Sequence, residues 1–65
     1  MRQEYLIEAM DAKGNWYNVG GSDRSSRIAQ GHMQEYRRAH PEQPVRVVEH
    51  PSGKIIALHD PRGKP

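Results

Sequence analysis

The feature that most constrains the fold is one amphipathic stretch, residues 22–40, set between two segments that each resemble a β-hairpin. Projecting residues 24–40 at about 100° per residue gathers small and apolar side chains on one side. That side holds Ile28, Ala29, His32, Met33, Tyr36 and Ala39. We therefore expect a helix that packs this side on a sheet, with His32 as a packing residue.

The ends of this helix carry recognisable signals. Ser22 or Asp23 is expected to be the N-cap, because a short side-chain oxygen accepts hydrogen bonds from the first amides of a helix. Basic residues occupy the last turn, where positive charge suits the helix dipole. Pro41 then ends the helix, because proline lacks the amide that would continue the hydrogen-bond ladder.

The segment before the helix predicts the first hairpin. Residues 3–10 read as a strand in which alternate side chains share a face, and residues 11–15 have the chemistry of a turn. Gly14 is suited to the left-handed position of that turn. Residues 16–19 form the returning strand, and we expect Gly20-Gly21 to break it.

The segment after the helix predicts the second hairpin. Residues 41–44 contain two prolines and form a stiff connection, and residues 44–50 follow as a strand. Pro51-Ser52-Gly53 is a turn, because proline presets φ and glycine supplies positive φ. Residues 54–59 complete the hairpin.

These elements predict an α+β fold of β-β-α-β-β order, with an antiparallel sheet of strand order 2-1-3-4 and the helix on one face. Residues 1–60 make a single domain, and residues 61–65 form a flexible C-terminal tail. One helix leaves the second face of the sheet uncovered. That face, or an edge strand, is where we expect a partner.

Composition limits how much core the chain can build. Leu, Ile and Val total ten of 65 residues and Phe is absent, so the core is thin and dimerisation would bury more apolar surface. The chain has no cysteine, which excludes disulfides and thiolate metal sites. The N-terminal segment is charged throughout and no apolar run reaches membrane length, so we expect a cytoplasmic protein.

The candidate contact residues are mostly basic. Three arginines project from the polar side of the predicted helix, and a glycine and a glutamine lie between them: Arg24, Arg27, Gly31, Gln34 and Arg38. Arginine suits phosphates and acidic surfaces, and an outward glycine permits close approach of a partner. Arg46, Lys54 and Trp16 complete the set. Trp16 and Tyr17 are adjacent on a strand, so one of them should point to the core and the other outward, where an aromatic ring could stack on a base or anchor a partner. The alternative is that one is buried in the core and the other forms an ordinary cross-strand pair. The alternative interpretation is a solvated helix face whose arginines pair with Glu35 and its neighbours.

Catalysis and metal binding have little support in the sequence. The aspartates lie in predicted turns, caps and tail, where backbone geometry explains them. Four histidines without cysteine make no recognisable zinc set. We therefore expect no enzymatic activity, no metal and no cofactor.

The chain also resembles many short phage and prophage reading frames. The resemblance lies in Trp16 before Gly20-Gly21, the Arg-rich helix, the proline-containing link and the strand at residues 45–48. It implies no site. The function expected from the residues is a small interaction module that binds a protein or itself through the uncovered sheet face or an edge strand. The alternative is a nucleic-acid-binding accessory protein that uses the basic side of its helix.

Overall fold

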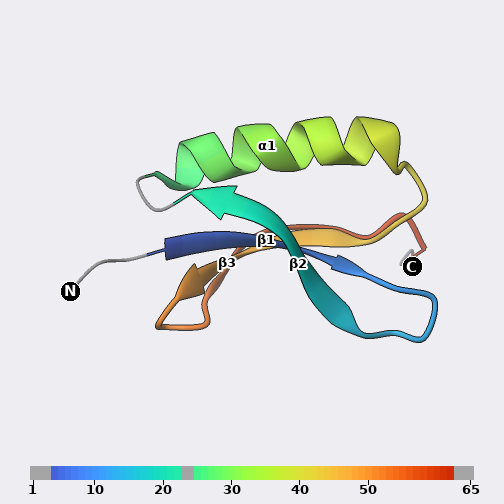
Figure 1. Cartoon of the computed structure of the whole chain (residues 1–65), viewed down its shortest axis with the longest axis horizontal. Helices are drawn as coiled ribbons and strands as arrows, with labels where there is room; N and C mark the ends of the chain where they lie inside the picture. The colour runs from blue at the N-terminus through green and yellow to red at the C-terminus, as the bar shows by residue number, and fades with distance from the viewer. Residues whose placement is uncertain (1–3, 23–24, 63–65) are drawn as a thin grey trace.

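The computed structural model describes residues 4–22 and 25–62, which form four strands and one helix. Figure 1 shows the helix lying lengthwise across one face of the sheet. The elements are β1 (Glu4–Met10), β2 (Trp16–Ser22), α1 (Ser26–Ala39), β3 (Val45–His50) and β4 (Ile55–His59). The predicted β-β-α-β-β order is confirmed.

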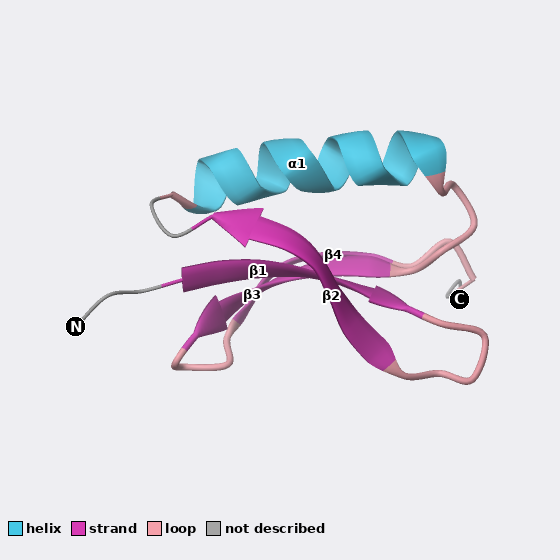
Figure 2. Ribbon diagram, in the orientation of Figure 1, coloured by secondary structure: helices cyan, strands magenta, loops and turns pink. Residues whose placement is uncertain are grey.

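The predicted sheet order is confirmed as well, because the strands are arranged β2-β1-β3-β4 and all neighbours are antiparallel. A helix of 14 residues is about 21 Å long, which matches the length of the strands beneath it. It therefore carries the chain from the end of β2 back to the start of β3, beside β1. The two hairpin turns consequently lie at opposite ends of the sheet (Figure 2).

Both turns use glycine as predicted. Asp11 accepts a backbone hydrogen bond from Gly14, whose φ is 91°, and its side chain accepts two more from the turn. In the second turn Gly53 has a φ of 79° and donates to the carbonyl of Glu49. Positive φ is nearly free of strain only for glycine, so the two positions anchor the hairpins.

The expected break at Gly20-Gly21 is wrong, because β2 continues through both glycines to Ser22. The pairing of β1 with β2 shifts between Ile7 and Glu8, which forms a bulge. Asn18 holds the bulge, since its side-chain amide donates to the carbonyls of Ile7 and Gly20. The two glycines allow β1 and β2 to approach closely. As a result, β2 ends three residues later than predicted.

The helix begins later than predicted. Ser25 is the N-cap, and its hydroxyl accepts from the amides of Arg27 and Ile28. Ser22, one of the two predicted caps, is the last residue of β2, and Asp23 lies outside the described residues. The predicted cap therefore lies about one turn before the observed one. The reason is that β2 continues through its two glycines and takes up Ser22, so the helix begins later.

The buried side of the helix is rotated from the predicted one. Ala29 and Met33 are buried as expected and Tyr36 packs against the core. His32 and Ala39 are exposed, so the prediction that His32 packs on the sheet is wrong. Ile28 is 45% exposed. The helix instead turns Gln30 and Arg37 partly toward the sheet, because long side chains can bury their stems and keep their polar ends near solvent.

The core is thin and lies between the helix and the sheet. Its buried members come from β1, β3 and the helix: Ile7, Ala9, Ala29, Met33, Val45 and Val47. The helix packs on β1, β2 and β3. The helix packs less on β4, the edge strand beside β3, although Ile56 and Ala57 of that strand lie against the core.

Candidate functional site

The uncovered face of the sheet brings together residues from three strands. Arg46 on β3 lies opposite Glu8 on β1, and their side chains form an ion pair at 2.8 Å. The guanidinium carbon of Arg46 also lies 4.1 Å from the ring centroid of Trp16, which opens β2. Trp16 therefore points away from the helix, as one of two adjacent aromatics on a strand must. Both charges are partly shielded, so this cluster is a fixed feature of the open face.

Apolar side chains surround this charged pair. The register places Leu6 opposite Val48 and Val48 opposite Ile55, while Leu58 lies opposite Arg46. The two β4 side chains are the most exposed, at 49% for Ile55 and 58% for Leu58. We define the open-face patch by its apolar members, Leu6, Trp16, Val48, Ile55 and Leu58. Exposed apolar side chains gathered on one side of a small domain are typical of a contact surface.

The predicted helix contacts lie in the opposite layer of the molecule. They are all exposed where the structure describes them: Arg27, Gly31, Gln34 and Arg38. Arg24 lies outside the described residues. Arg46 and Trp16 lie on the open face of the sheet, which the helix does not cover, so they do not join the helix residues in one surface. Lys54 is also separate, at the turn between β3 and β4.

The helix arginines are unpaired among the residues that the structure describes. Neither Arg27 nor Arg38 makes an ion pair there. In the described part of the chain, no ion pair joins either arginine to Glu35. The first turn of α1 holds no acidic residue and its last turn holds Arg37 and Arg38, so the helix surface is positively charged.

A hydroxyl and amide network fixes the link after the helix. The Gln43 amide donates to the Tyr17 hydroxyl at 2.7 Å and to the Met10 carbonyl at 3.0 Å, and its carbonyl accepts from the Tyr36 hydroxyl at 2.8 Å. The two tyrosine oxygens lie 3.4 Å apart, and His40 stacks on the Tyr36 ring. One glutamine thus joins β1, β2 and α1, which holds the end of the helix over the sheet.

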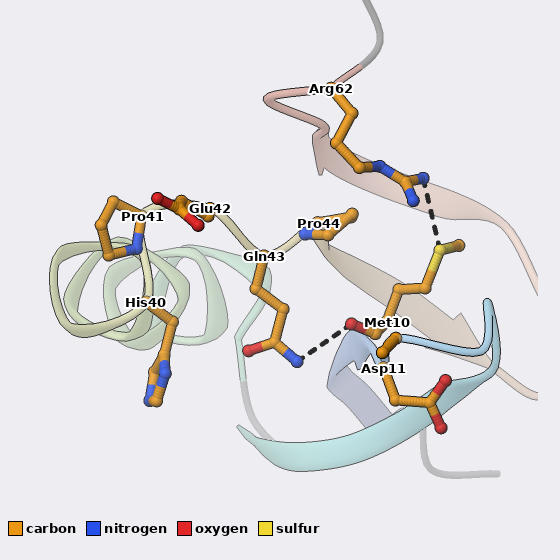
Figure 3. A pocket seen from close by; sticks show the side chains of 9 residues that line it. Met10, Asp11, His40, Pro41, Glu42, Gln43, Pro44 and Arg62 are labelled. Atoms are coloured by element: carbon orange, nitrogen blue, oxygen red, sulfur yellow. Dashed lines mark hydrogen bonds between the residues drawn. The ribbon is translucent and has the colours of Figure 1, made fainter.

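A shallow depression of about 550 Å³ opens beside this network. Figure 3 shows Gln43 pointing from the proline-containing link toward Met10 at its floor, with Arg62 approaching from the C-terminal side. Arg62 donates to the Met10 sulfur at 3.3 Å and pairs with Asp60. Residues 63–65 of the predicted tail lie outside the described residues. Three of the polar side chains that line the depression, Asp11, Gln43 and Arg62, already bond to other groups of the chain.

The tyrosine pair gives the network a testable titration. Hydrogen bonds from Tyr36 and then Gln43 lower the pKa of Tyr17, whereas partial burial and then the bond with Tyr17 raise the pKa of Tyr36 to about 12. Tyr17 should therefore ionise before Tyr36. Between pH 10 and about 12 the unfolded chain releases a proton that folded Tyr36 retains, so stability falls as the pH rises through this window.

Tyrosinate absorbance of the wild type and of Tyr36→Phe and Tyr17→Phe variants measures this order. The Tyr36→Phe variant should lose the late step and the Tyr17→Phe variant the early one. Tyr17 and Tyr36 titrating together near pH 10 would show that the network does not exist in solution.

Sequence reasoning missed Gln43 and Glu8. From the sequence, Gln43 was treated only as part of a stiff connection. Its position between two prolines could have indicated a structural role, because a rigid backbone holds a long polar side chain in one direction. Glu8 was one of several charges on β1, and only the strand register shows that it faces Arg46. The His50 Nε2 and Arg37 Nε atoms are buried without a hydrogen-bond partner, which no sequence pattern indicates.

The described residues contain no group of three or more histidine, aspartate or glutamate side chains placed to hold a metal ion. Within the same part of the chain, no helix is long and apolar enough to cross a membrane. No family model, curated protein or solved structure matches the chain. The function must therefore be argued from the surfaces themselves.

Proposed function

We propose that the protein is a non-enzymatic, cytoplasmic interaction module that self-associates through the open face of its sheet. The observation that carries the proposal is the open-face patch, where Ile55 and Leu58 expose about half of their surface beside a sheet face that no helix covers. A second copy would cover these side chains. The thin core gives the chain a further reason to associate, because small domains gain stability by burying surface between subunits.

The size of the face indicates a reversible dimer. Four strands that lie about 4.8 Å apart and are about 20 Å long give one sheet face an area on the order of 400 Å². Two stacked copies would therefore bury about 800 Å² in total. Stable specific interfaces bury roughly 1,200–2,000 Å². Stacked sheets lie about 10 Å apart, close enough for side chains to interdigitate. We therefore expect association at micromolar or weaker affinity.

The charges of the face favour a second copy over an unrelated partner. Glu8 and Arg46 lie side by side among the apolar residues of the patch. A twofold axis near this pair brings each Glu8 toward the Arg46 of the second copy, so the surface is complementary to itself. Because the two charges are already paired within each chain, neither is buried alone when the faces meet.

Leu58→Glu is expected to weaken self-association by at least about tenfold, because each open face would then carry two carboxylates, Glu8 and the introduced one, beside the single guanidinium of Arg46. Two such faces repel each other when they stack, and the apolar contact of Leu58 is lost as well. The fold should persist, since Leu58 is 58% exposed in one chain. Sedimentation over a concentration series measures the dissociation constant, and a melting temperature that rises with concentration provides a second readout.

Ile28→Glu is the matched control. It makes the same kind of change at an exposed aliphatic residue of the opposite layer, so it should leave the dissociation constant unchanged. A wild-type chain that sediments as a monomer at millimolar concentration would contradict the proposal. Equal weakening by both variants would show that general surface charge, and not the open face, decides association.

One observation favours nucleic-acid binding as the second candidate function. Arg27 and Arg38 are exposed and form no ion pair within the described residues, so they are available to phosphates. Amide shifts confined to the outer side of α1, induced by a DNA duplex and reversed by salt, would favour this candidate over self-association.

A further inference from the structure

We propose that a small basic pocket beside the C-terminal half of α1 binds a phosphate group. The pocket has a volume of about 180 Å³ and is lined by Gln34, Arg37, Arg38, Pro41 and His59. It forms because β4 extends the sheet past the helix, which leaves a shelf between the last turns of α1 and the end of β4. It lies on the helix side of the sheet, away from the open-face patch.

The lining of the pocket has one kind of chemistry. The pocket is lined by two arginines, one histidine, one glutamine and one proline, and no acidic side chain in the described part of the chain lines it. Arginine presents several donors in a planar fork that matches the oxygens of a phosphate. Two arginines can neutralise a doubly charged phosphate, whereas a carboxylate needs only one. The side chains therefore select for phosphate over a carboxylate.

Arg37 reaches the pocket from the buried side of the helix. It lies four residues after buried Met33, so its stem follows the buried side of the helix toward β4. Its Nε is buried and has no hydrogen-bond partner. A buried donor without an acceptor is rare in folded proteins and costs free energy. Because this Nε is closed off from solvent, the terminal amino groups of the guanidinium are the donors that Arg37 can offer an oxyanion in the pocket.

His59 closes the pocket from the sheet side. It ends β4 opposite Val45, whose side chain is buried in the core, so the imidazole lies on the helix side of the sheet. Arg38 and Gln34 complete the opposite wall from the helix. The negative end of the helix dipole opposes an anion at this position, so the side chains must provide the affinity.

Titration of the full-length ¹⁵N-labelled protein with sodium phosphate tests the proposal. Acetate and chloride at matched ionic strength are the reference anions. We expect saturable shifts of the Arg37 Nε–H and of the Gln34, Arg38 and His59 signals with phosphate and not with the reference anions. Absent shifts, or equal shifts with acetate, would overturn the proposal.

Arg38→Gln and Arg37→Met should each weaken phosphate binding about tenfold, because each removes charge-assisted hydrogen bonds. The Met side chain keeps the apolar stem of Arg37, and Arg38→Gln decides the outcome if Arg37→Met does not fold. Arg27→Gln, a loss of the same charge elsewhere on α1, should leave binding unchanged. Equal weakening by Arg27→Gln would show diffuse charge attraction and overturn the pocket.

A second arm identifies the source of the phosphate. A short single-stranded oligonucleotide without terminal phosphates presents only phosphodiesters. Shifts of the pocket residues with both the oligonucleotide and inorganic phosphate would assign the pocket to a nucleic-acid backbone, whereas shifts with inorganic phosphate alone would assign it to a free phosphate or monoester. Neither result depends on self-association, which uses the other layer of the molecule.

Discussion

Gly21→Ala is expected to lower the free energy of unfolding by about 3 kcal/mol. Two costs contribute: the backbone conformation disfavours any side chain, and the added Cβ atom collides with the neighbouring strand. Gly21 has a φ of 155° within β2. A Cβ atom there would collide with the carbonyl oxygen of Tyr5 and lie 3.1 Å from the Cα of Leu6. Both are backbone atoms of the neighbouring strand, so relief requires β1 and β2 to separate.

Urea unfolding of Gly21→Ala beside two other glycine variants separates these contributions. Gly14→Ala carries a positive φ of 91° but has open space around it, so it should cost only about 1–2 kcal/mol. Gly31→Ala lies in the exposed helix with nothing nearby and should gain up to about 1 kcal/mol. A cost at Gly21 no larger than that at Gly14 would show that the strands do not approach so closely.

The glycines illustrate how far local chemistry predicts this fold. Gly14 and Gly53 follow residues typical of turns, and the sequence predicts both hairpins correctly from them. Gly20-Gly21 carries the same local signal, yet here glycine permits two strands to approach within a sheet. Whether a glycine ends a strand or allows a close approach depends here on the pairing of β2 with β1. Local residue propensities carry no information about that pairing.

The sequence predicted that this segment is an amphipathic helix, but it did not predict which side of the helix faces the sheet. The sequence projection placed the centre of the buried side among the apolar and small residues. It therefore assigned Ile28 and His32 to that side. The structure instead buries Ala29 and Met33 and partly covers Arg37. A projection that ranks residues by polarity assigns arginine to solvent, although its long stem can cover apolar surface.

The candidate surfaces were predictable to different degrees. The exposed arginines of α1 follow from helical periodicity alone. The cluster of Glu8, Arg46 and Trp16 requires the register of three strands, and a shift of one residue would send each side chain to the other face. The phosphate pocket requires still more, since it depends on how far β4 extends beyond the helix.

Met33→Ala is expected to lower the free energy of unfolding by about 3 kcal/mol, within the range of about 2–5 kcal/mol for such truncations in a core. Met33 is 5% exposed, and the small core around it has few side chains that could collapse into the space. A domain of this size is expected to have only about 3–10 kcal/mol of stability, so the variant should be close to unfolded.

Denaturant unfolding of Met33→Ala together with Ile28→Ala and His32→Ala tests the rotation of the helix. Ile28 is 45% exposed, so its truncation should cost less than about 1 kcal/mol, and exposed His32 should contribute within about 0.5 kcal/mol. Comparable losses at Ile28 and Met33 would mean that the helix faces the sheet as the sequence projection suggested. That rotation would turn Arg37 away from β4 and remove the phosphate pocket, whereas a loss confined to Met33 keeps Arg37 on the side of the helix that lies near His59.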